Sequence, residues 1–381
     1  MIDICIIGGG AAGLTAAISA KEADSTLRVV IIEKKEEVGK KLLTTGNGKC
    51  NMTNLACPGQ KETLGFFGSL GVLTRHDSQG RVYPYTEEAR AVRDALLQRA
   101  EDLGVEVFTS AEVLGVKKNQ EHFLIELGKE KLEAEKLLIA TGGKSAPQCG
   151  STGDGYRFAK SLGHKVNRLV PVLTAIDVKE DTKDLAGIRA KAKVSLTFNN
   201  EEIFSEEGEV QFTATGVSGI CIFNMSRLLL IPEGKTIKNG FDDYRIHIDF
   251  FPEVDVNILQ ILLAERRLTA FKGNRLLDYM VKKPLAERIL KVAESEREVA
   301  TMLKDFQLSP SGAKGWNFAQ VTKGGVALDE VVPETMESRL IDNLFFAGEV
   351  LDYDGPCGGF NLQYAWETGI KAGRGMAREH R

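Results

Sequence analysis

Three glycines and one glutamate near the beginning of the chain have the types and spacing of a nucleotide-binding turn. Gly8, Gly10 and Gly13 form GxGxxG between an apolar strand and a helix, and Glu33 ends the next strand. Gly8 permits a tight turn, Gly10 lets the backbone approach a pyrophosphate, and Gly13 packs helix against strand. The Glu33 carboxylate accepts hydrogen bonds from ribose hydroxyls and argues against a ribose 2′-phosphate. The motif predicts a dinucleotide held at the N-terminus of the helix.

Two later glycine turns are expected to face the same ligand. The segments 140–143 (ATGG) and 346–350 (FAGEV) each follow a buried apolar strand. In a doubly wound sheet, the carboxyl ends of the strands border the ligand crevice. Around the fingerprint and the first of these turns, we add four residues to the predicted binding set: Ala11, Ala12, Lys34 and Thr141.

The elements that must position these turns follow from hydrophobic periodicity. Residues 2–34 read as strand, glycine turn, helix and strand, which is a βαβ unit. Residues 89–103 have helical spacing and are ended by Gly104, before a third parallel strand at 105–110. Short alternating segments between 114 and 136 predict an antiparallel meander, which leads into another buried strand.

The middle of the chain has a different character and predicts an insertion. Alternating polar and apolar residues predict a β-rich unit at 188–251, and helical periodicity dominates 252–322. Pro284 suits the first turn of a new helix. We therefore expect a discontinuous dinucleotide-binding domain made of residues 1–187 and 323–381.

Composition limits the classes of partner and compartment. The 381 residues carry 49 Lys and Arg against 53 Asp and Glu, so a net charge of -4 offers no overall field for nucleic acid. No apolar run approaches a bilayer span, and the N-terminus lacks signal-peptide features, so we expect a soluble cytoplasmic protein without a membrane partner.

Cysteine and histidine usage predicts no metal site. The six cysteines show no CxxC spacing and read as reduced thiols, including the nearest pair, Cys50 and Cys57. The five histidines are scattered singly. No triad or P-loop pattern stands out either.

Several motifs together resemble the aminoacetone oxidase and BaiN-like flavoprotein family of NAD(P)/FAD-dependent oxidoreductases. They are GGGAAG, GKKLLTTGNGKCNMTN, GRVYPYT, ATGG, FTATGVSG, TKGGV and FAGEVLDYDGPCGGFNLQYAWETG. The resemblance implies an α/β fold, with a glutathione-reductase-type Rossmann domain that holds non-covalent FAD and is interrupted by a β unit and a helical unit. It also implies hydride transfer at flavin N5 with a small amine or enone-like substrate, as an oxidase or as an NAD(P)H-fed reductase.

The resemblance also assigns residues to the cofactor. It implies that Lys41 and the loop from Thr45 to Asn51, including Gly46, run alongside the flavin. It places Val113 near the adenine and Gly142 near the pyrophosphate. The ribityl chain and the pyrimidine end of the ring would be held by Gly348, Glu349, Gly358, Gly359, Asn361 and Leu362. Lys40 reads instead as a solvated residue.

The sequence departs from the family pattern at two places. The family commonly has a histidine in the FTHxGxSGP motif where this chain has Ala214. The stretch 54–64 is also shorter than is usual in the family. A mechanism that depends on that histidine is therefore in doubt here.

Without the histidine, modest polar groups are the candidates for catalysis. We expect the insertion to cover the flavin, with Thr213 facing a pocket shared with Tyr83 and Tyr85, whose alternative role is ordinary packing. No second GxGxxG follows residue 13, so NAD(P)H is expected to react transiently in the substrate cavity. Two other classes stay open: a tRNA-modifying flavoprotein and a flavin-binding sensor without turnover. The oligomeric state is left open.

Overall fold

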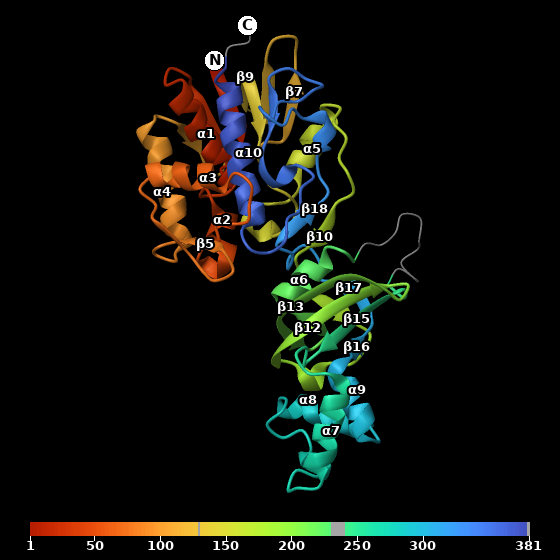
Figure 1. Cartoon of the computed structure of the whole chain (residues 1–381). Coiled ribbons are helices and arrows are strands. Elements are labelled where there is room, and N and C mark those ends of the chain that lie inside the picture. Colours follow the sequence, from red (N-terminus) through yellow and green to blue (C-terminus); the bar gives the residue numbers. More distant parts are fainter. Residues whose placement is uncertain (129, 230–240, 379–381) are drawn as a thin grey trace. The chain divides into compact units, whose positions relative to one another are not determined.

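The computed structural model describes residues 1–128, 130–229 and 241–378 and divides into two compact units. Unit 1 comprises Met1–Pro171 and Gln320–Arg381, and unit 2 comprises Val172–Ala319. Each unit has its own cluster of buried apolar side chains. Figure 1 shows both units with the strands and helices labelled.

A largely parallel sheet forms the centre of unit 1. Its strand order is β6-β2-β1-β9-β8-β7. β19 also pairs with β9, parallel to the last residues of that strand. The strands are β1 (Ile2–Ile7), β2 (Val29–Ile32), β6 (Glu106–Phe108), β7 (Gly115–Lys118), β8 (Phe123–Leu127), β9 (Glu130–Ile139) and β19 (Leu344–Phe346). β1 and β2 are almost wholly buried, as expected for strands covered on both faces.

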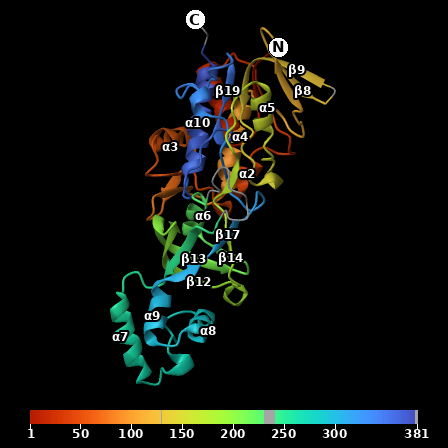
Figure 2. The same ribbon diagram turned by 90° about the vertical axis from the view of Figure 1, so that its right-hand side faces the viewer.

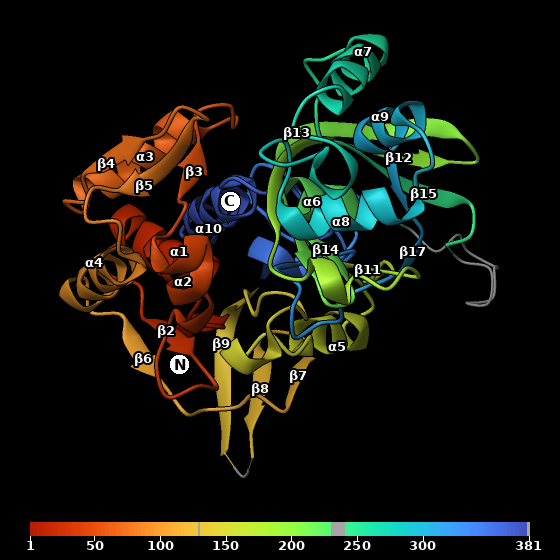
Figure 3. The same cartoon turned by 90° about the horizontal axis from the view of Figure 1, so that it is seen from below.

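The helices of unit 1 pack on this sheet. They are α1 (Ala11–Ala23), α2 (Lys40–Thr44), α3 (Gln60–Ser69), α4 (Ala89–Asp102), α5 (Asp154–Ser161) and α10 (Phe360–Met376). α1 and α10 lie side by side (Figure 3) because glycines let the two backbones approach. A Cβ added at Gly373 would lie 2.3 Å from the Ala16 carbonyl oxygen.

Two small sheets complete unit 1. One contains β3 (Thr53–Asn54), β4 (Thr74–His76) and β5 (Arg81–Pro84) in the order β3-β5-β4. The other pairs β10 (Val170–Val172) with β18 (Val321–Lys323). The second pair brings the chain back into unit 1 after the insertion.

Unit 2 contains an antiparallel sheet with helices packed against it. The strand order is β16-β15-β12-β13-β14-β11-β17. The strands are β11 (Ile176–Val178), β12 (Arg189–Phe198), β13 (Glu201–Thr213), β14 (Gly216–Ser218), β15 (Tyr244–Asp249), β16 (Phe306–Leu308) and β17 (Pro310–Ala313). The helices are α6 (Ile220–Ser226), α7 (Val256–Arg267), α8 (Lys283–Val292) and α9 (Glu296–Lys304). In Figure 2, α7, α8 and α9 form a group at one end of this sheet, apart from α6.

The structure corrects several local expectations. The last strand of the meander and the buried strand after it are one strand, β9, which pairs antiparallel with β8 and parallel with β1. Residues 276–280, which have helical spacing, form turns instead. β11 begins before residue 188, and β16 and β17 join the β sheet although they lie within 252–322. The division into three domains at 188, 252 and 323 stays a prediction.

Pro284 lies in the first turn of α8, as expected, since proline needs no hydrogen-bond acceptor there. None of the helices in the described residues combines the length and apolarity needed to cross a bilayer. Within the same residues, no group of three or more His, Cys, Asp or Glu side chains is arranged to hold a metal ion.

Candidate cofactor site

The glycine turn between β1 and α1 has the geometry that its motif predicts. Gly8 has φ of +108°, and a Cβ there would lie 2.5 Å from the Ala140 carbonyl oxygen. A Cβ at Gly13 would lie 2.0 Å from the Gly8 carbonyl oxygen, so helix and strand meet at this point. A Cβ at Gly10 would meet nothing within 4 Å. The open side of Gly10 therefore leaves room for a ligand at the N-terminus of α1.

Glu33 is oriented by backbone amides at the end of β2. Its two carboxylate oxygens each accept one N–H group, from Gly9 and from Lys35, at 2.9 Å. The Glu33 carbonyl oxygen accepts from Ala111, which begins the loop that carries the buried Val113. The residues expected at the ribose and adenine therefore lie at one sheet edge, and the carboxylate keeps lone pairs for further donors.

Lys34 extends this edge toward α5. Its ammonium donates to the Asp154 carboxylate at 2.5 Å and also to the Thr152 hydroxyl. Burial acts to raise the pKa of Asp154, but the hydrogen bonds from Lys34 and Thr152 outweigh it and hold the pKa below its usual range. Lys34 is therefore engaged in an ion pair beside the predicted ribose site.

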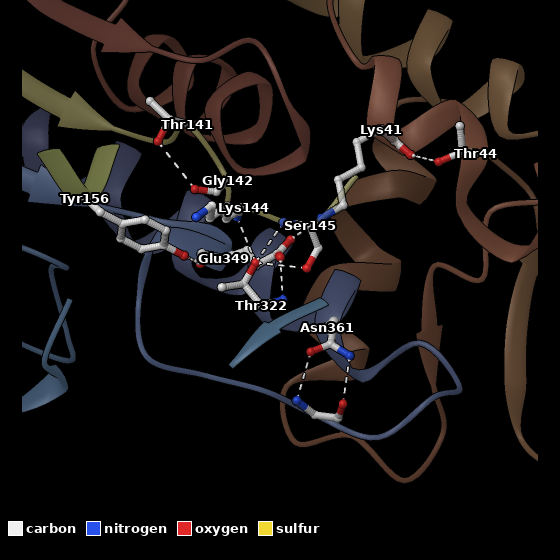
Figure 4. A network of polar contacts seen from close by, with 11 residues as sticks. Lys41, Thr44, Thr141, Gly142, Lys144, Ser145, Tyr156, Thr322, Glu349 and Asn361 are labelled. Atoms are coloured by element: carbon white, nitrogen blue, oxygen red, sulfur yellow. Dashed lines mark hydrogen bonds and ion pairs between the residues drawn. The ribbon is translucent and has the colours of Figure 1, made fainter. Parts of the chain in front are cut away.

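A polar network connects α2 with the ends of β9, β18 and β19. The Lys41 ammonium donates to Glu349 at 2.6 Å, and the second Glu349 oxygen accepts the Thr322 N–H at 2.8 Å. The Thr322 hydroxyl oxygen accepts from the N–H groups of Lys144 and Ser145 at 2.8 and 3.0 Å. Figure 4 shows these side chains converging from three distant parts of the sequence. The sequence motifs indicate Lys41 and Glu349 as cofactor residues and single out neither Thr322 nor Ser145.

The first glycine turn after β9 borders this network. The Thr141 hydroxyl donates to the Gly142 carbonyl oxygen at 3.4 Å, and Gly142 has φ of +71°. The phenol of Tyr156 donates to the Glu349 carbonyl oxygen at 3.2 Å (Figure 4). Burial raises the pKa of Tyr156, so the phenol remains a donor. Tyr156 was another residue that the motifs did not indicate.

The loop before α10 is held by Asn361. Its side-chain amide donates to the Gly355 carbonyl oxygen and accepts the Gly355 N–H, at 2.9 and 2.8 Å (Figure 4). Gly358 and Gly359 have φ of +118° and +101°, which favours glycine. Leu362 packs against the core of unit 1. These residues shape the loop that precedes the helix N-terminus.

Three further predicted residues lie between α2 and β3. The Thr45 hydroxyl donates to the Leu42 carbonyl oxygen at 2.6 Å, and Gly46 has φ of +57°. In the orientation of its side-chain amide that satisfies both polar atoms, Asn51 donates its N–H to the Thr53 carbonyl oxygen, and its amide oxygen accepts the Gly359 N–H. The same loop therefore contacts the strand and the glycine turn that precedes α10.

The three candidates for catalysis lie in different surroundings. A Cβ at Gly46 would lie 3.6 Å from the Tyr83 ring, so half-buried Tyr83 borders the predicted flavin loop. Tyr85 is 63% exposed, and the Arg75 guanidinium lies 5.2 Å from its ring centre. Thr213 ends β13 in unit 2, where its carbonyl oxygen accepts the Thr182 hydroxyl. Tyr83 thus lies in β5 and Tyr85 follows the end of that strand, whereas Thr213 belongs to the other unit.

These features fit FAD. The open Gly10, the N-terminus of α1 and the Glu33 carboxylate suit an ADP half, and the segments 41–51 and 348–362, which are expected at the flavin, belong to the same unit. A Rossmann-type unit with this site defines an FAD-dependent oxidoreductase.

Comparison with known proteins identifies the family. The chain belongs to the family described as HI0933-like protein Rossmann domain, whose model matches residues 2–61 and 55–375. A 3-dehydro-bile acid delta(4,6)-reductase of Clostridium scindens is 34% identical over 99% of both chains. A ribosomal RNA dihydrouridine synthase of Escherichia coli is 29% identical over 96% of both chains.

The comparisons also bear on the short stretch at 54–64. The family model matches in two pieces that overlap at residues 55–61, and the alignment with the bile acid reductase runs over 415 positions, more than the 381 residues here.

Among solved structures, a flavocytochrome c3 fumarate reductase in an open conformation has the same fold. Its TM-score is 0.52 at 16% identity, over 99% of this chain and 78% of that chain.

Proposed function

We propose that this enzyme uses FAD to reduce a carbon–carbon double bond conjugated to a carbonyl group, with NAD(P)H as the electron donor. The names of its relatives carry the proposal. A 3-dehydro-bile acid delta(4,6)-reductase acts on double bonds in conjugation with a ring ketone. A dihydrouridine synthase saturates the uracil double bond that is conjugated to a ring carbonyl. The two substrates differ in size and charge but share this reacting group.

The cofactor would be held by the groups described above. Gly10 and the N-terminus of α1 would receive the pyrophosphate, and Glu33 the ribose. Bound FAD supplies hydride transfer at N5. The ammonium of Lys41, held by Glu349, provides a fixed positive charge that favours electron-rich groups beside it.

Tyr83 is the best candidate for the proton that the second carbon of the double bond requires. Burial raises the pKa of Tyr83, and the positive charge of Arg81 only partly opposes this, so the phenol is protonated at neutral pH. Tyr85 is more exposed and less suited to a pocket that limits water. Thr213 stays a candidate for binding the carbonyl.

The test is a pair of anaerobic half-reactions. The heated protein should release FAD rather than FMN, and NADPH or NADH should bleach the bound flavin. A cyclic enone should then restore the oxidised spectrum and appear as its saturated product. NAD(P)H should compete with the enone, because both react in one cavity. Bleaching by an amine, followed by reoxidation only in air, would instead identify an oxidase and overturn the proposal.

Variants separate the candidate acid from its neighbours. Tyr83→Phe should slow enone-dependent reoxidation about 10²- to 10⁴-fold while bleaching by NADPH is unchanged. Tyr85→Phe and Thr213→Val test the other two candidates in the same assay. A parental rate for Tyr83→Phe would remove Tyr83 from the mechanism.

A second candidate substrate is uracil within RNA. The dihydrouridine synthases of Escherichia coli and Haemophilus influenzae, at 29% and 26% identity, favour it, although the net charge of -4 does not. Incubation of the NADPH-reduced enzyme with an unmodified ribosomal RNA transcript, followed by mass spectrometry of the nucleosides, decides between dihydrouridine and no product.

A further inference from the structure

Unit 2 contains an open pocket that the cofactor site does not use. Its volume is about 430 Å³, and it lies between the start of β12 and the segment that leads into α8. Its lining includes Arg189, Lys191, Phe250, Tyr279 and Lys282. The lining combines three cations with two aromatic rings and contains no carboxylate residue.

The pocket exists because β15 is shorter than its neighbour. β15 pairs with β12 only from Lys193 onward, where Lys193 faces Asp249. The chain then leaves the sheet at Phe250, whose N–H donates to the Leu303 carbonyl oxygen. Residues 189–192 of β12 therefore have no strand partner on this side within the described part of the chain. Their free edge leaves backbone donors and acceptors beside the pocket.

The cations at the pocket are available to an anion. Arg189 has one ion pair, with Glu209 at 3.2 Å, in which both side chains are more than half exposed. Such exposed pairs are weak and exchange readily with other anions. Lys191 and Lys282 are exposed, and neither forms an ion pair with another described residue.

Tyr279 is held at the rim on unusual backbone. Its φ is +65°, a conformation that disfavours a bulky residue, and its side chain is 89% exposed. The ring makes an edge contact with Phe271 at 6.1 Å, and the guanidinium of Arg266 lies 4.3 Å from the Phe271 ring centre. The Tyr279 ring thus contacts Phe271, while most of the residue is open to solvent.

We propose that this pocket binds a nucleotide. The phosphate would lie against Lys191, Lys282 and Arg189, and the base would stack on Tyr279. The same chemistry is offered by a nucleotide within an RNA strand and by a free dinucleotide such as NADPH. The site goes beyond the proposed reduction, because binding here does not depend on which double bond is reduced.

The experiment measures binding to the oxidised holoenzyme without turnover. One arm follows the fluorescence anisotropy of a 12-nucleotide uridine-rich RNA with a red dye. The other arm titrates NADP⁺ by isothermal titration calorimetry, because NADP⁺ has the same phosphates and adenine as NADPH but has no hydride to transfer to the flavin. Both are repeated with Lys282→Gln and with Lys283→Gln. Lys283 is a matched control, because it is adjacent and exposed but does not line the pocket.

For one of the two ligands, Lys282→Gln should weaken binding at least fivefold and reduce the slope of log affinity against log salt by about 1. Lys283→Gln should change that affinity less than twofold. Tyr279→Leu should weaken the same ligand about tenfold, whereas Tyr279→Phe, which retains the ring, should not. The sensitive arm identifies the source of the nucleotide.

Equal effects of Lys282→Gln and Lys283→Gln would show only a diffuse electrostatic attraction and overturn the proposal. So would the absence of saturable binding by both ligands at physiological salt, or binding that ignores Lys282 and Tyr279. Failure of enone reduction leaves these measurements intact, so the two proposals can fail separately.

Discussion

Glu33 shows how a single side chain combines a structural and a binding role. Its carboxylate accepts the N–H groups of Gly9 and Lys35, so it stabilises the turn that carries the fingerprint. The same oxygens retain lone pairs for ribose hydroxyls. A substitution at this residue is therefore expected to affect both the turn and the ligand.

We expect Glu33→Ala to weaken FAD binding by about 1–3 kcal/mol, because the backbone donors and the ribose hydroxyls lose their acceptor. Fluorescence titration of the flavin-free protein with FAD gives the dissociation constant. Glu36→Ala is the control, since Glu36 is an exposed residue of the following loop that pairs with Lys40. Unchanged affinity in Glu33→Ala would mean that the ribose is held elsewhere.

The pair of Lys41 and Glu349 supports a second prediction at this scale. Their side chains are 24% and 19% exposed, so each charge depends on the other more than in a surface pair. We expect Lys41→Met or Glu349→Gln to lower the free energy of unfolding by about 1–3 kcal/mol, between the values for exposed and buried pairs. The double variant should lose less than the sum. Urea unfolding of the four flavin-free proteins measures this coupling, and additive losses would exclude it.

At the scale of elements, small residues allow α1 and α10 to pack closely against each other. Alanines and glycines on the two helices allow the backbones to approach: a Cβ at Gly369 would lie 2.6 Å from the Ala12 carbonyl oxygen. The start of α1 therefore lies beside the middle of α10. A larger side chain at the crossing would have to displace backbone atoms. The position of the α1 N-terminus therefore depends on its packing against the interior of α10.

Two glycine-to-alanine substitutions isolate this packing from helix propensity. Both Gly373 in α10 and Gly65 in α3 lie inside helices, where alanine is favoured by about 0.5–1 kcal/mol. A Cβ at Gly65 would meet nothing within 4 Å, so Gly65→Ala should raise the melting temperature. A Cβ at Gly373 would lie 2.3 Å from a backbone oxygen, so Gly373→Ala should destabilise by about 1–3 kcal/mol. Thermal unfolding of both variants checks the opposite signs.

At the scale of the whole molecule, the chain returns to unit 1 after 148 residues of unit 2. The returning segment adds β19 to the largely parallel sheet of unit 1. The returning segment is held partly by His164, which bonds Glu330 at 3.0 Å and Ser338 at 2.9 Å. The His164 ring also makes an edge contact with Phe346 of β19. This buried imidazole therefore joins the two halves of the discontinuous unit.

The state of His164 makes stability depend on pH. Burial lowers the pKa of His164 and outweighs the opposing effect of the hydrogen bond that Glu330 accepts from the imidazole. The unfolded chain takes up this proton below about pH 6.5, whereas the folded chain resists it until lower pH. Stability from this group is thus complete above pH 6.5 and falls on acidification, by up to about 1.4 kcal/mol per pH unit.

We expect His164→Gln to flatten the decline in unfolding free energy below pH 6.5, while His76→Gln, at an exposed histidine, leaves the curve parallel to the parent. Urea unfolding between pH 5 and 8 gives the curves. An unchanged slope in His164→Gln would show that other groups control the acid sensitivity.

Local features of this protein were determined by sequence alone. The glycine turn with Glu33 is specified within one βαβ unit, where each residue has a distinct steric or hydrogen-bonding task, and α4 and α8 follow from periodicity with Gly104 and Pro284 at their ends. The family, the Rossmann fold and the FAD were predictable for the same reason, because their signals lie in short segments.

Only the tertiary structure decided which distant groups meet. Lys41 and Glu349 are separated by 308 positions in the sequence. Thr322 donates its N–H to Glu349, and no local sequence pattern singles out Thr322 for this contact. β9 continues through the meander, and β16 and β17 return to the sheet, because strand pairing is a long-range interaction. Periodicity reports which face of a segment is buried, but the partner that buries it is chosen by the packing of the whole unit.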